Sequence, residues 1–156
     1  MLTLRRGAPA DLEVVLRHNL AMAAETEGLA LDPSAARRGA EAALAGEQGA
    51  FYLLAEQGGE VLGQLMVTTE WSDWRAATVW WIHSVYVAPE ARRRGVYRAL
   101  HHAARTEAQR AGAAGLRLYV DARNQPAMAV YRSMGMDGEH YRVFEQIFEP
   151  PPPSQG

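Results

Sequence analysis

Apolar and polar positions alternate along this chain with two different periods, and each period predicts one kind of element. Apolar residues at helical spacing predict helices over 8–28, 32–46, 95–111 and 124–135. Runs rich in β-branched and aromatic residues predict strands over 2–7, 77–87, 115–122 and 141–149, and a hairpin over 50–71. The pattern therefore predicts a chain that mixes helices and strands.

Turn and cap residues support these boundaries. Gly28 is suited to end the first helix, because glycine adopts the left-handed conformation that closes a helix. Asp32 is suited to cap the second helix, with Pro33 as its first residue. Gly58 and Gly59 lie between the two apolar runs of the hairpin and predict its turn.

The order of the elements predicts one α/β (α+β) domain over residues 1–149. The strands 77–87 and 115–122 flank a helix, so we expect them to be parallel neighbours joined by a right-handed crossover. The hairpin adds antiparallel strands, and the central sheet is then mixed and mostly antiparallel, with about four helices around it. Residues 150–156, PPPPSQG, predict a disordered tail.

Composition narrows the class of protein. The chain has 156 residues, of which 48% are hydrophobic and 22% charged, and these values are typical of one globular domain. No run approaches the ~20 apolar residues of a membrane span, and the N-terminus lacks a signal-peptide layout, so we expect a bacterial-type cytoplasmic protein. The net charge of −2 argues against nucleic-acid binding. Without cysteine, disulfides, thiolate metal sites and cysteine nucleophiles are excluded, and the sequence shows no metal site.

The segment SVYVAPEARRRGVYRAL, residues 84–100, carries the candidate chemistry. Three arginines and Gly95 lie where a strand passes into a helix. The first amides of a helix are unpaired and carry partial positive charge, a glycine lets a ligand approach the backbone, and arginine binds phosphate. This combination predicts an anion-binding turn, and the alternative is a solvated basic loop in front of an ordinary helix.

The spacing in this segment resembles the acetyl-CoA signature of the GNAT N-acetyltransferase superfamily. Val87, Pro89, Arg92 and Gly95 match it, whereas Tyr97 stands where the family usually has Gly or Ala. The resemblance implies that backbone amides from about Arg93 to Arg98 hold the pyrophosphate of coenzyme A. It also implies that the strand from about Ser84 to Val87 contacts the thioester and the pantetheine. The residues implied for the cofactor in this segment are Val85, Tyr86, Val87, Arg92, Arg93, Arg94, Gly95, Val96, Tyr97 and Arg98.

A second segment, NQPAMAVYRSMGM, is similar to a later motif of the same family. Asn124, Ala127, Tyr131, Gly135 and Met136 match it. The resemblance implies that Tyr131 protonates the leaving thiolate of coenzyme A, and a phenol is a sensible donor for that proton. Asn124 then contacts the cofactor or orders the start of the helix. A tyrosine on a helix is otherwise explained by core packing.

The acceptor side offers several candidates for the base that deprotonates an amine. His83 lies on the strand before the loop and shares strand parity with Trp81, Val85 and Val87, although a structural histidine is the alternative. Rival bases are Glu70, Asp73 and Asp121. His101 and His102 are expected at the surface. Candidate substrate-binding residues are Trp71, Trp74, Trp81 and Glu25. For Glu25, as for Glu27, the alternative is a solvated carboxylate at the surface.

These features together predict an enzyme that transfers an acetyl group from acetyl-CoA to a primary amine, in particular that of a small molecule. The chain has no cysteine that could carry the acetyl group as an intermediate. We therefore expect the amine to attack acetyl-CoA directly in a ternary complex. The alternatives are a non-catalytic acyl-CoA sensor of the same fold and a protein N-terminal or lysine acetyltransferase. The resemblance also implies a homodimer. The sequence does not choose the amine.

Overall fold

The computed structural model describes residues 1–149. It contains one five-stranded sheet, four α-helices and three short 3₁₀ turns, and residue contacts divide the chain into two compact units, Met1–Asn124 and the part from Gln125 onward. The elements of the first unit are β1 (Thr3–Arg6), α1 (Leu12–Glu27), α2 (Pro33–Leu44), β2 (Phe51–Gln57), β3 (Glu60–Ser72), β4 (Ala77–Val87), α3 (Val96–Arg110) and β5 (Gly115–Leu118). The second unit contains α4 (Gln125–Ser133).

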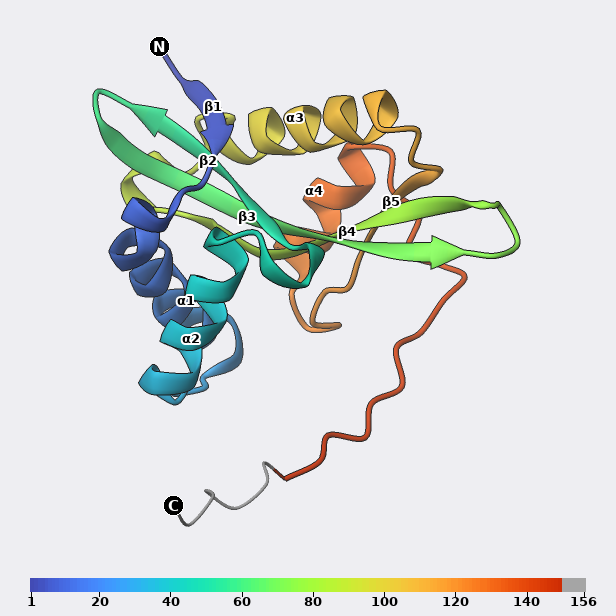
Figure 1. The fold of residues 1–156 in the computed structure, drawn as a ribbon, viewed down its shortest axis with the longest axis horizontal. Helices are drawn as coiled ribbons and strands as arrows, with labels where there is room; N and C mark the ends of the chain where they lie inside the picture. The colour runs from blue at the N-terminus through green and yellow to red at the C-terminus, as the bar shows by residue number, and fades with distance from the viewer. Residues whose placement is uncertain (150–156) are drawn as a thin grey trace. The chain divides into compact units, whose positions relative to one another are not determined.

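The sheet follows the order β1-β2-β3-β4-β5, with antiparallel neighbours except for the parallel pair of β4 and β5. Helix α3 covers one face, and helices α1 and α2 cover the other (Figure 1). The two faces have separate cores. One is built around Leu65, Ile82 and Leu100, and the other around Val15, Tyr52 and Leu54. The predicted mixed sheet and its parallel pair are therefore confirmed.

Strand β4 contains an irregularity that the sequence pattern did not predict. Its register against β3 shifts between the pairs Gln64–Tyr86 and Met66–His83, so two residues of β4 lie opposite one residue of β3. Ser84, in this bulge, has a φ of +51°. The bulge reverses the alternation of side chains: Val85 and Val87 pack on the α3 side, whereas Trp81 and His83 belong to the α1 side. The predicted shared parity of these four residues is wrong beyond His83.

Glycine 63 sets how closely α3 approaches the sheet. A Cβ on Gly63 would lie 2.8 Å from Cγ1 of Val96 and 3.4 Å from Cδ1 of Leu100. Only a residue without a side chain lets the first turn of α3 lie directly on β3. Because Val96 is the first residue of α3, this contact fixes the position of the helix N-terminus.

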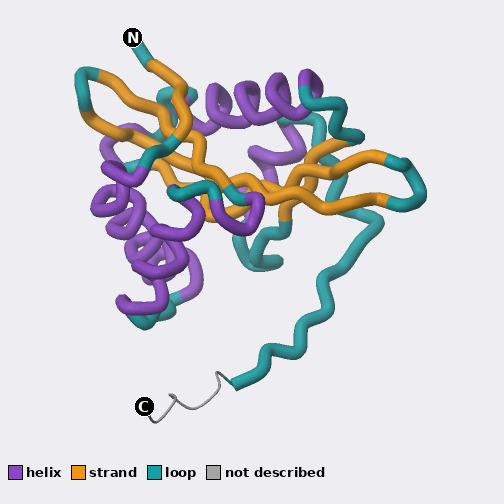
Figure 2. Tube along the Cα trace, in the orientation of Figure 1, coloured by secondary structure: helices purple, strands orange, loops and turns teal. Residues whose placement is uncertain are grey.

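Several predicted boundaries are confirmed. Gly28 is left-handed and closes α1, and Oδ1 of Asp32 accepts a hydrogen bond from the backbone of Ser34 at the start of α2. The hairpin turns at Gly58 and Gly59, as predicted. Figure 2 shows the second hairpin, formed by the long strands β3 and β4, reaching beyond the helices.

Three predictions are corrected. No strand forms over 141–149, because a β-strand needs a neighbouring strand with which to exchange hydrogen bonds, and none pairs with this segment in the described part of the chain. Strand β5 ends at Leu118 rather than at residue 122, since its ladder with β4 stops at the pair Ile82–Leu118, just before the bulge. His101 is buried, with 3% of its surface exposed, whereas His102 is exposed as expected. The predicted disorder of 150–156 lies outside the described residues.

The second unit is described by itself. Helix α4 ends at Ser133; Gly135, two residues later, has a φ of +87°, and the amide of Met136 donates to the carbonyl of Tyr131 at 3.1 Å. This is a glycine-terminated helix end of the usual kind. The segment after it carries exposed apolar side chains, namely Val143, Phe144, Ile147 and Phe148.

Candidate active site

The turn before α3 forms a cradle of backbone amides. The chain passes from β4 through a 3₁₀ turn, Pro89–Ala91, to Gly95, which is the N-cap of α3 with a φ of +78°. No side chain caps this helix, and its first backbone bond runs from the amide of Ala99 to the carbonyl of Gly95 at 3.1 Å. The amides at the start of α3 are therefore available to an anion, and the helix dipole favours negative charge there.

The space above this cradle is open. A Cβ on Gly95 would meet no atom within 4 Å, and Arg93 also adopts a positive φ, +63°. A run of left-handed and right-handed residues turns successive amides toward one side, which is a common way to bind phosphate. The side chain of Val96 is buried, so only its backbone can serve a ligand. The residues present fit a pyrophosphate.

The arginines before the cradle differ in their surroundings. Arg92 is exposed but engaged at the surface: Nε donates to the carbonyl of Val87 at 3.0 Å, and Nη2 pairs with Glu25 at 2.7 Å. Arg94 donates to Oε1 of Gln57 at 3.0 Å. Arg93 and Arg98 are both exposed. Arg92 thus holds the loop against β4, whereas Arg93, Arg94 and Arg98 present positive charge around the cradle.

Glu25 belongs to this loop rather than to the tryptophans with which the sequence grouped it. Its carboxylate accepts from Arg92 and also from the hydroxyl of Tyr86, at 3.1 Å. The Arg92 guanidinium lowers the pKa of Glu25, and burial together with Glu25 raises the pKa of the Tyr86 phenol. The side chain of Tyr86 is thereby turned toward α1. The predicted cofactor contact of Tyr86 is therefore left to its backbone.

Beyond the bulge, strand β4 pairs with a strand on one side only within residues 1–149. It continues to pair with β3 as far as the pair Gly63–Val87, but its ladder with β5 has ended at Ile82. Backbone donors and acceptors of β4 on the β5 side are strong hydrogen-bonding groups that need a partner. An extended molecule such as the pantetheine arm can take the place of a strand there.

Tyr97, the departure from the family pattern, lies on the first turn of α3. Its hydroxyl is 3.0 Å from Nδ1 of the buried His101, and the two rings meet edge to face at 5.7 Å. Burial lowers the pKa of His101. The side chain of Tyr97 is therefore held against the helix on which it lies.

An aromatic cluster lies on the α1 side of the sheet, directly before the bulge. The rings of Trp81 and His83 are stacked, with centroids 6.2 Å apart, and Tyr119 packs its ring at 5.8 Å from His83. Nε2 of His83 is 2.8 Å from the hydroxyl of Thr68. Burial lowers the pKa of His83, so the imidazole is neutral at pH 7 and able to accept a proton.

The rival carboxylates have other partners. Glu70 pairs with Arg117 at 2.9 Å and accepts from the indole of Trp81 at 3.3 Å. Arg123 holds the pKa of Asp121 at about 2, so this carboxylate is a weak base. Asp73 accepts the backbone amide of the following residue in the exposed β3–β4 turn.

Two of the four tryptophans lie away from the buried cores. Trp71 and Trp74, near the tip of the β3–β4 hairpin, are 65% and 88% exposed.

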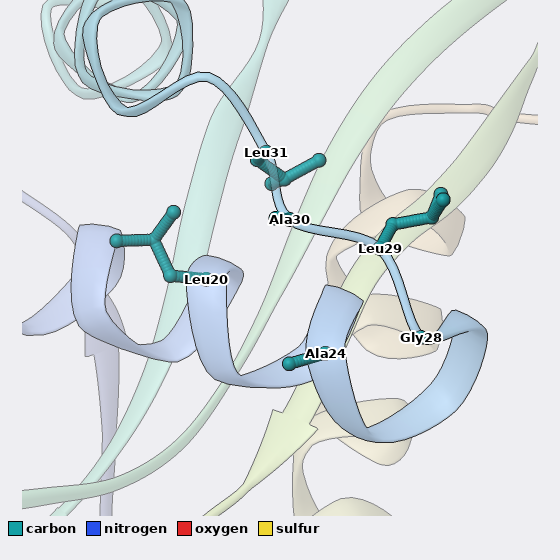
Figure 3. A pocket seen from close by; sticks show the side chains of 6 residues that line it. All are labelled: Leu20, Ala24, Gly28, Leu29, Ala30 and Leu31. Atoms are coloured by element: carbon teal, nitrogen blue, oxygen red, sulfur yellow. The ribbon is translucent and has the colours of Figure 1, made fainter.

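A shallow pocket of about 380 Å³ lies between the end of α1 and the segment after it (Figure 3). It is lined by Leu20, Ala24, Gly28, Leu29, Ala30 and Leu31. Without a titratable group, this pocket cannot perform acid–base chemistry.

Tyr131 and Asn124 keep the roles that the sequence gave them as predictions. Tyr131 lies on α4, and burial raises the pKa of its phenol, which keeps the proton on the hydroxyl at neutral pH. The amide of Asn124 donates to the carbonyl of Asp121 at 2.8 Å, in the turn before α4.

One set of buried polar residues was missed by the sequence analysis. His18, Asn19, Gln64 and Tyr52 form hydrogen bonds to one another beneath the bulge. A signal for this network was present in the sequence, because Gln64 interrupts an apolar strand and His18 lies on the apolar side of α1.

Within residues 1–149, no group of three or more His, Asp or Glu side chains is arranged to hold a metal, and no helix is long and apolar enough to cross a membrane.

Comparison with known proteins places this geometry in a family. The model of the Acetyltransferase (GNAT) family matches residues 34–136. A solved structure, a possible acetyltransferase from Clostridium difficile 630, is 33% identical with a TM-score of 0.88, covering 96% of this chain and 99% of that one. The comparison with curated proteins gave no match.

Two further structures share the fold at lower identity. An aminoglycoside acetyltransferase from an uncultured soil metagenomic sample is 21% identical, with a TM-score of 0.70 and coverage of 95% and 99%. A ribosomal-protein-alanine N-acetyltransferase from Brucella melitensis biovar Abortus 2308 is 15% identical, with a TM-score of 0.76 and coverage of 96% and 100%. The chain therefore belongs to the GNAT family of acetyltransferases, and it is an acyltransferase.

Proposed function

We propose that this enzyme transfers the acetyl group of acetyl-CoA to the primary amine of a small molecule. GNAT enzymes generally use acetyl-CoA as the acyl donor. The observation that carries the proposal is the cradle at Gly95, where an uncapped helix start faces open space next to a β4 edge that has lost its β5 partner. This arrangement suits a pyrophosphate followed by an extended pantetheine arm.

In this proposal, the amides from Arg93 to Arg98 hold the pyrophosphate, and Arg93, Arg94 and Arg98 add positive charge. The backbone of β4 from Ser84 to Val87 orients the thioester carbonyl and stabilises the charge that develops on its oxygen. Bound acetyl-CoA supplies an acetyl group activated as a thioester. Arg92 contributes by holding the loop in place rather than by binding phosphate, since its guanidinium is paired with Glu25.

Two side chains move protons in the proposed reaction. His83 removes a proton from the ammonium form of the substrate and leaves a neutral amine, because the imidazole is neutral, half-buried and next in sequence to the bulge. A bond then forms between the amine nitrogen and the acetyl carbon while the bond from that carbon to sulfur breaks, and the nitrogen releases its second proton to water. Tyr131 gives its phenolic proton to the departing sulfur. Among the candidates, Glu70 and Asp121 are disfavoured as the base by their arginine partners.

The fold alone does not select the acceptor, since one neighbour of this fold is an aminoglycoside acetyltransferase and another a ribosomal-protein-alanine N-acetyltransferase. The small-molecule proposal rests on the aromatic cluster of Trp81, His83 and Tyr119 beside the bulge. Trp71 and Trp74 are exposed near the tip of the same hairpin, with Asp73 between them in the sequence, but Trp71 lies on the opposite, α3 face of the sheet. The aromatic cluster suits a cationic or aromatic amine. A peptide acceptor and a non-catalytic acyl-CoA sensor are the competing proposals.

Turnover of acetyl-CoA with a panel of small amines tests the function. Tyr131→Phe is expected to lower kcat by about 100-fold, the usual loss of a general acid, while the affinity for acetyl-CoA stays unchanged. Tyr141→Phe, at a side chain that is 79% exposed, is the matched control. Acetyl-CoA binding by the wild type without turnover for any amine or peptide would favour the sensor.

The pH dependence tests the base. Because the folded pKa of His83 lies below its ordinary 6.5, kcat/KM should rise as pH increases through that lower pKa. His83→Gln should remove this limb and lower kcat/KM by about 100-fold. His102→Gln, on the exposed side of α3, should leave the profile intact. A wild-type limb that survives His83→Gln would assign the base elsewhere.

The proposal includes a homodimer in a bacterial cytoplasm. Four apolar side chains between residues 143 and 148 are more than half exposed, and such a segment suits pairing with a second copy. Light scattering on the full chain and on a chain ending at residue 140 tests this. A dimer that becomes a monomer on truncation is expected, and a monomeric full chain would contradict the proposal.

A further inference from the structure

A chain of buried polar side chains lies under the bulge of β4. Gln64 on β3 is fully buried, and His18 on α1 is 4% exposed. Nε2 of Gln64 donates to Oδ1 of Asn19 at 2.8 Å, and Nδ2 of Asn19 donates to the hydroxyl of Tyr52 at 3.1 Å. Buried polar groups of this kind are costly unless every one is paired, so their presence in the core needs a reason.

The network ends on one residue, Ser84, from two directions. Nε2 of Gln64 donates its second proton to the backbone carbonyl of Ser84 at 3.2 Å. The Ser84 side chain lies near the hydroxyl of Tyr52 and acts to lower the pKa of this phenol, against the larger raising effect of burial. The bulge residue is thus held at its carbonyl by Gln64, with the Tyr52 hydroxyl beside its side chain.

The proton positions in this network follow from the partners. Because both protons of the Gln64 amide are donated, its Oε1 must accept, and it faces Nδ1 of His18 at 3.2 Å. His18 therefore carries its proton on Nδ1, and burial lowers the pKa of the ring, which keeps it neutral. No buried side-chain nitrogen or oxygen among residues 1–149 is left without a hydrogen bond.

The residue so held is in a strained conformation. Ser84 has a φ of +51°, in the left-handed region that residues with a Cβ avoid. Such conformations persist only where the surroundings determine them, and they concentrate at functional sites. Here the surroundings are the network, and the strained residue begins the stretch of β4 that no longer pairs with β5.

A second set of contacts from α1 holds the rest of this stretch. The ring of His18 packs on Tyr86 with centroids 4.9 Å apart, and Tyr86 bonds to Glu25, which pairs with Arg92 of the cradle loop. Helix α1 therefore contacts both the stretch of β4 after Ser84 and the cradle loop that follows it.

We propose that the buried network of His18, Asn19, Gln64 and Tyr52 is a positioning device that holds the Ser84 bulge in the geometry needed for acetyl transfer. The inference rests on the proposed function, because it assumes that the Ser84–Val87 backbone orients the thioester. These four are positioning residues: they act through the backbone of Ser84. Loss of the network leaves the pyrophosphate cradle intact and misplaces the reacting carbonyl.

The test uses Tyr52→Phe and Gln64→Leu in the full chain. The control is Val67→Ala, a buried residue of β3 that faces α3 on the other side of the sheet. Amide hydrogen exchange, measured without any cofactor, should become about tenfold faster at Ser84, Val85 and Tyr86 in the network variants, because a strained segment has lost a buried hydrogen bond. Exchange over Val79–Ile82 should change less. Val67→Ala should affect both stretches alike.

Kinetics give the second readout. Tyr52→Phe should lower kcat by about tenfold or more while the affinity for acetyl-CoA changes by less than about threefold, because the loss lies at the reacting carbonyl. Val67→Ala should leave kcat within about twofold at a temperature where it is folded. If Gln64→Leu does not fold, Tyr52→Phe decides alone, since it removes one hydroxyl.

The outcomes separate the inference from the function on which it rests. Unchanged exchange at Ser84–Tyr86 in a folded Tyr52→Phe variant would overturn the positioning role, whatever the enzyme transfers. Faster local exchange with unchanged kcat would also overturn it. A wild type that binds no acetyl-CoA would refute the proposed function, while the exchange data would still show whether the network holds the bulge.

Discussion

The two glycines at the ends of α3 allow the cradle to be tested with a built-in control. Gly95 and Gly112 both have a φ of +78°, and a Cβ on either would meet no atom within 4 Å. Alanine at either position is therefore strained by its backbone conformation and by nothing else. Only Gly95, however, lies at the helix N-terminus where the anion is proposed to bind.

The stability cost should be the same for both variants. A left-handed alanine costs about 1–2 kcal/mol, and the reduced freedom of the unfolded chain returns about 0.4–1 kcal/mol. The net loss of about 0.5–1 kcal/mol corresponds to a fall in Tm of about 1–4 °C for a chain of this size. Gly95→Ala and Gly112→Ala should therefore melt within about a degree of each other.

Affinity should separate the two. A methyl group on Gly95 points into the space above the amides and keeps a phosphate from approaching to hydrogen-bonding distance. Loss of one charge-assisted hydrogen bond, about 1.5–3 kcal/mol, predicts a CoA affinity reduced by about 10- to 100-fold in Gly95→Ala and unchanged in Gly112→Ala. Calorimetric titration of both variants with CoA measures this. Equal affinities for the two variants would refute the assignment of the cradle.

Other predictions concern stability and the acceptor side. Gly63→Ala should cost about 1–3 kcal/mol in thermal unfolding, because its Cβ would lie 2.8 Å from the side chain at the start of α3, whereas Gly39→Ala in the middle of α2 meets no atom and should stabilise by about 0.5–1 kcal/mol. Arg5 holds the pKa of Asp11 below its ordinary 3.8, so this stabilisation is present above pH 4 and is lost as pH falls through the lowered pKa. Arg5→Leu should therefore cost about 1–2 kcal/mol in urea unfolding at pH 7 and less as the pH is lowered below 4; a constant difference would contradict this. Trp74→Ala should leave Tm within about 1 °C and raise KM for the amine; an unchanged KM would exclude it from acceptor binding.

The part of the fold that the sequence could predict is the part decided locally. Asp32 and Pro33 mark a helix start by their own side chains, and Gly95 marks the turn before α3 because few other residues tolerate its conformation. The order of strands followed from short connections and from the crossover helix. These features need no knowledge of distant contacts.

The bulge in β4 could not be predicted, because it depends on how β4 meets β3. The alternation from Trp81 to Val87 appears unbroken in the sequence, and only the register against β3 shows that it reverses at Ser84. The missed network has the same origin. Gln64 appears as one polar residue in an apolar strand, and its partners come from two other elements, α1 and β4.

The segment over 141–149 shows the opposite limit. Its composition favours a strand, but β-structure requires a partner, and composition does not supply one. His101 was expected at the surface because it lies on a polar-looking helix, yet it is buried with its ring paired to Tyr97 one turn earlier. In both cases the outcome depended on neighbours rather than on the residue type.

The most direct test of the central claim is the titration of isotope-labelled protein with CoA, followed through the backbone amide resonances. The account predicts that the largest shifts fall on the amides from Arg93 to Arg98, with a second set over Ser84–Val87, and that residues of the β3–β4 turn respond little. Saturable shifts confined to these two stretches would place the cofactor in the cradle and along the free edge of β4. An absence of shifts, or shifts centred on any other part of the chain, would contradict the account.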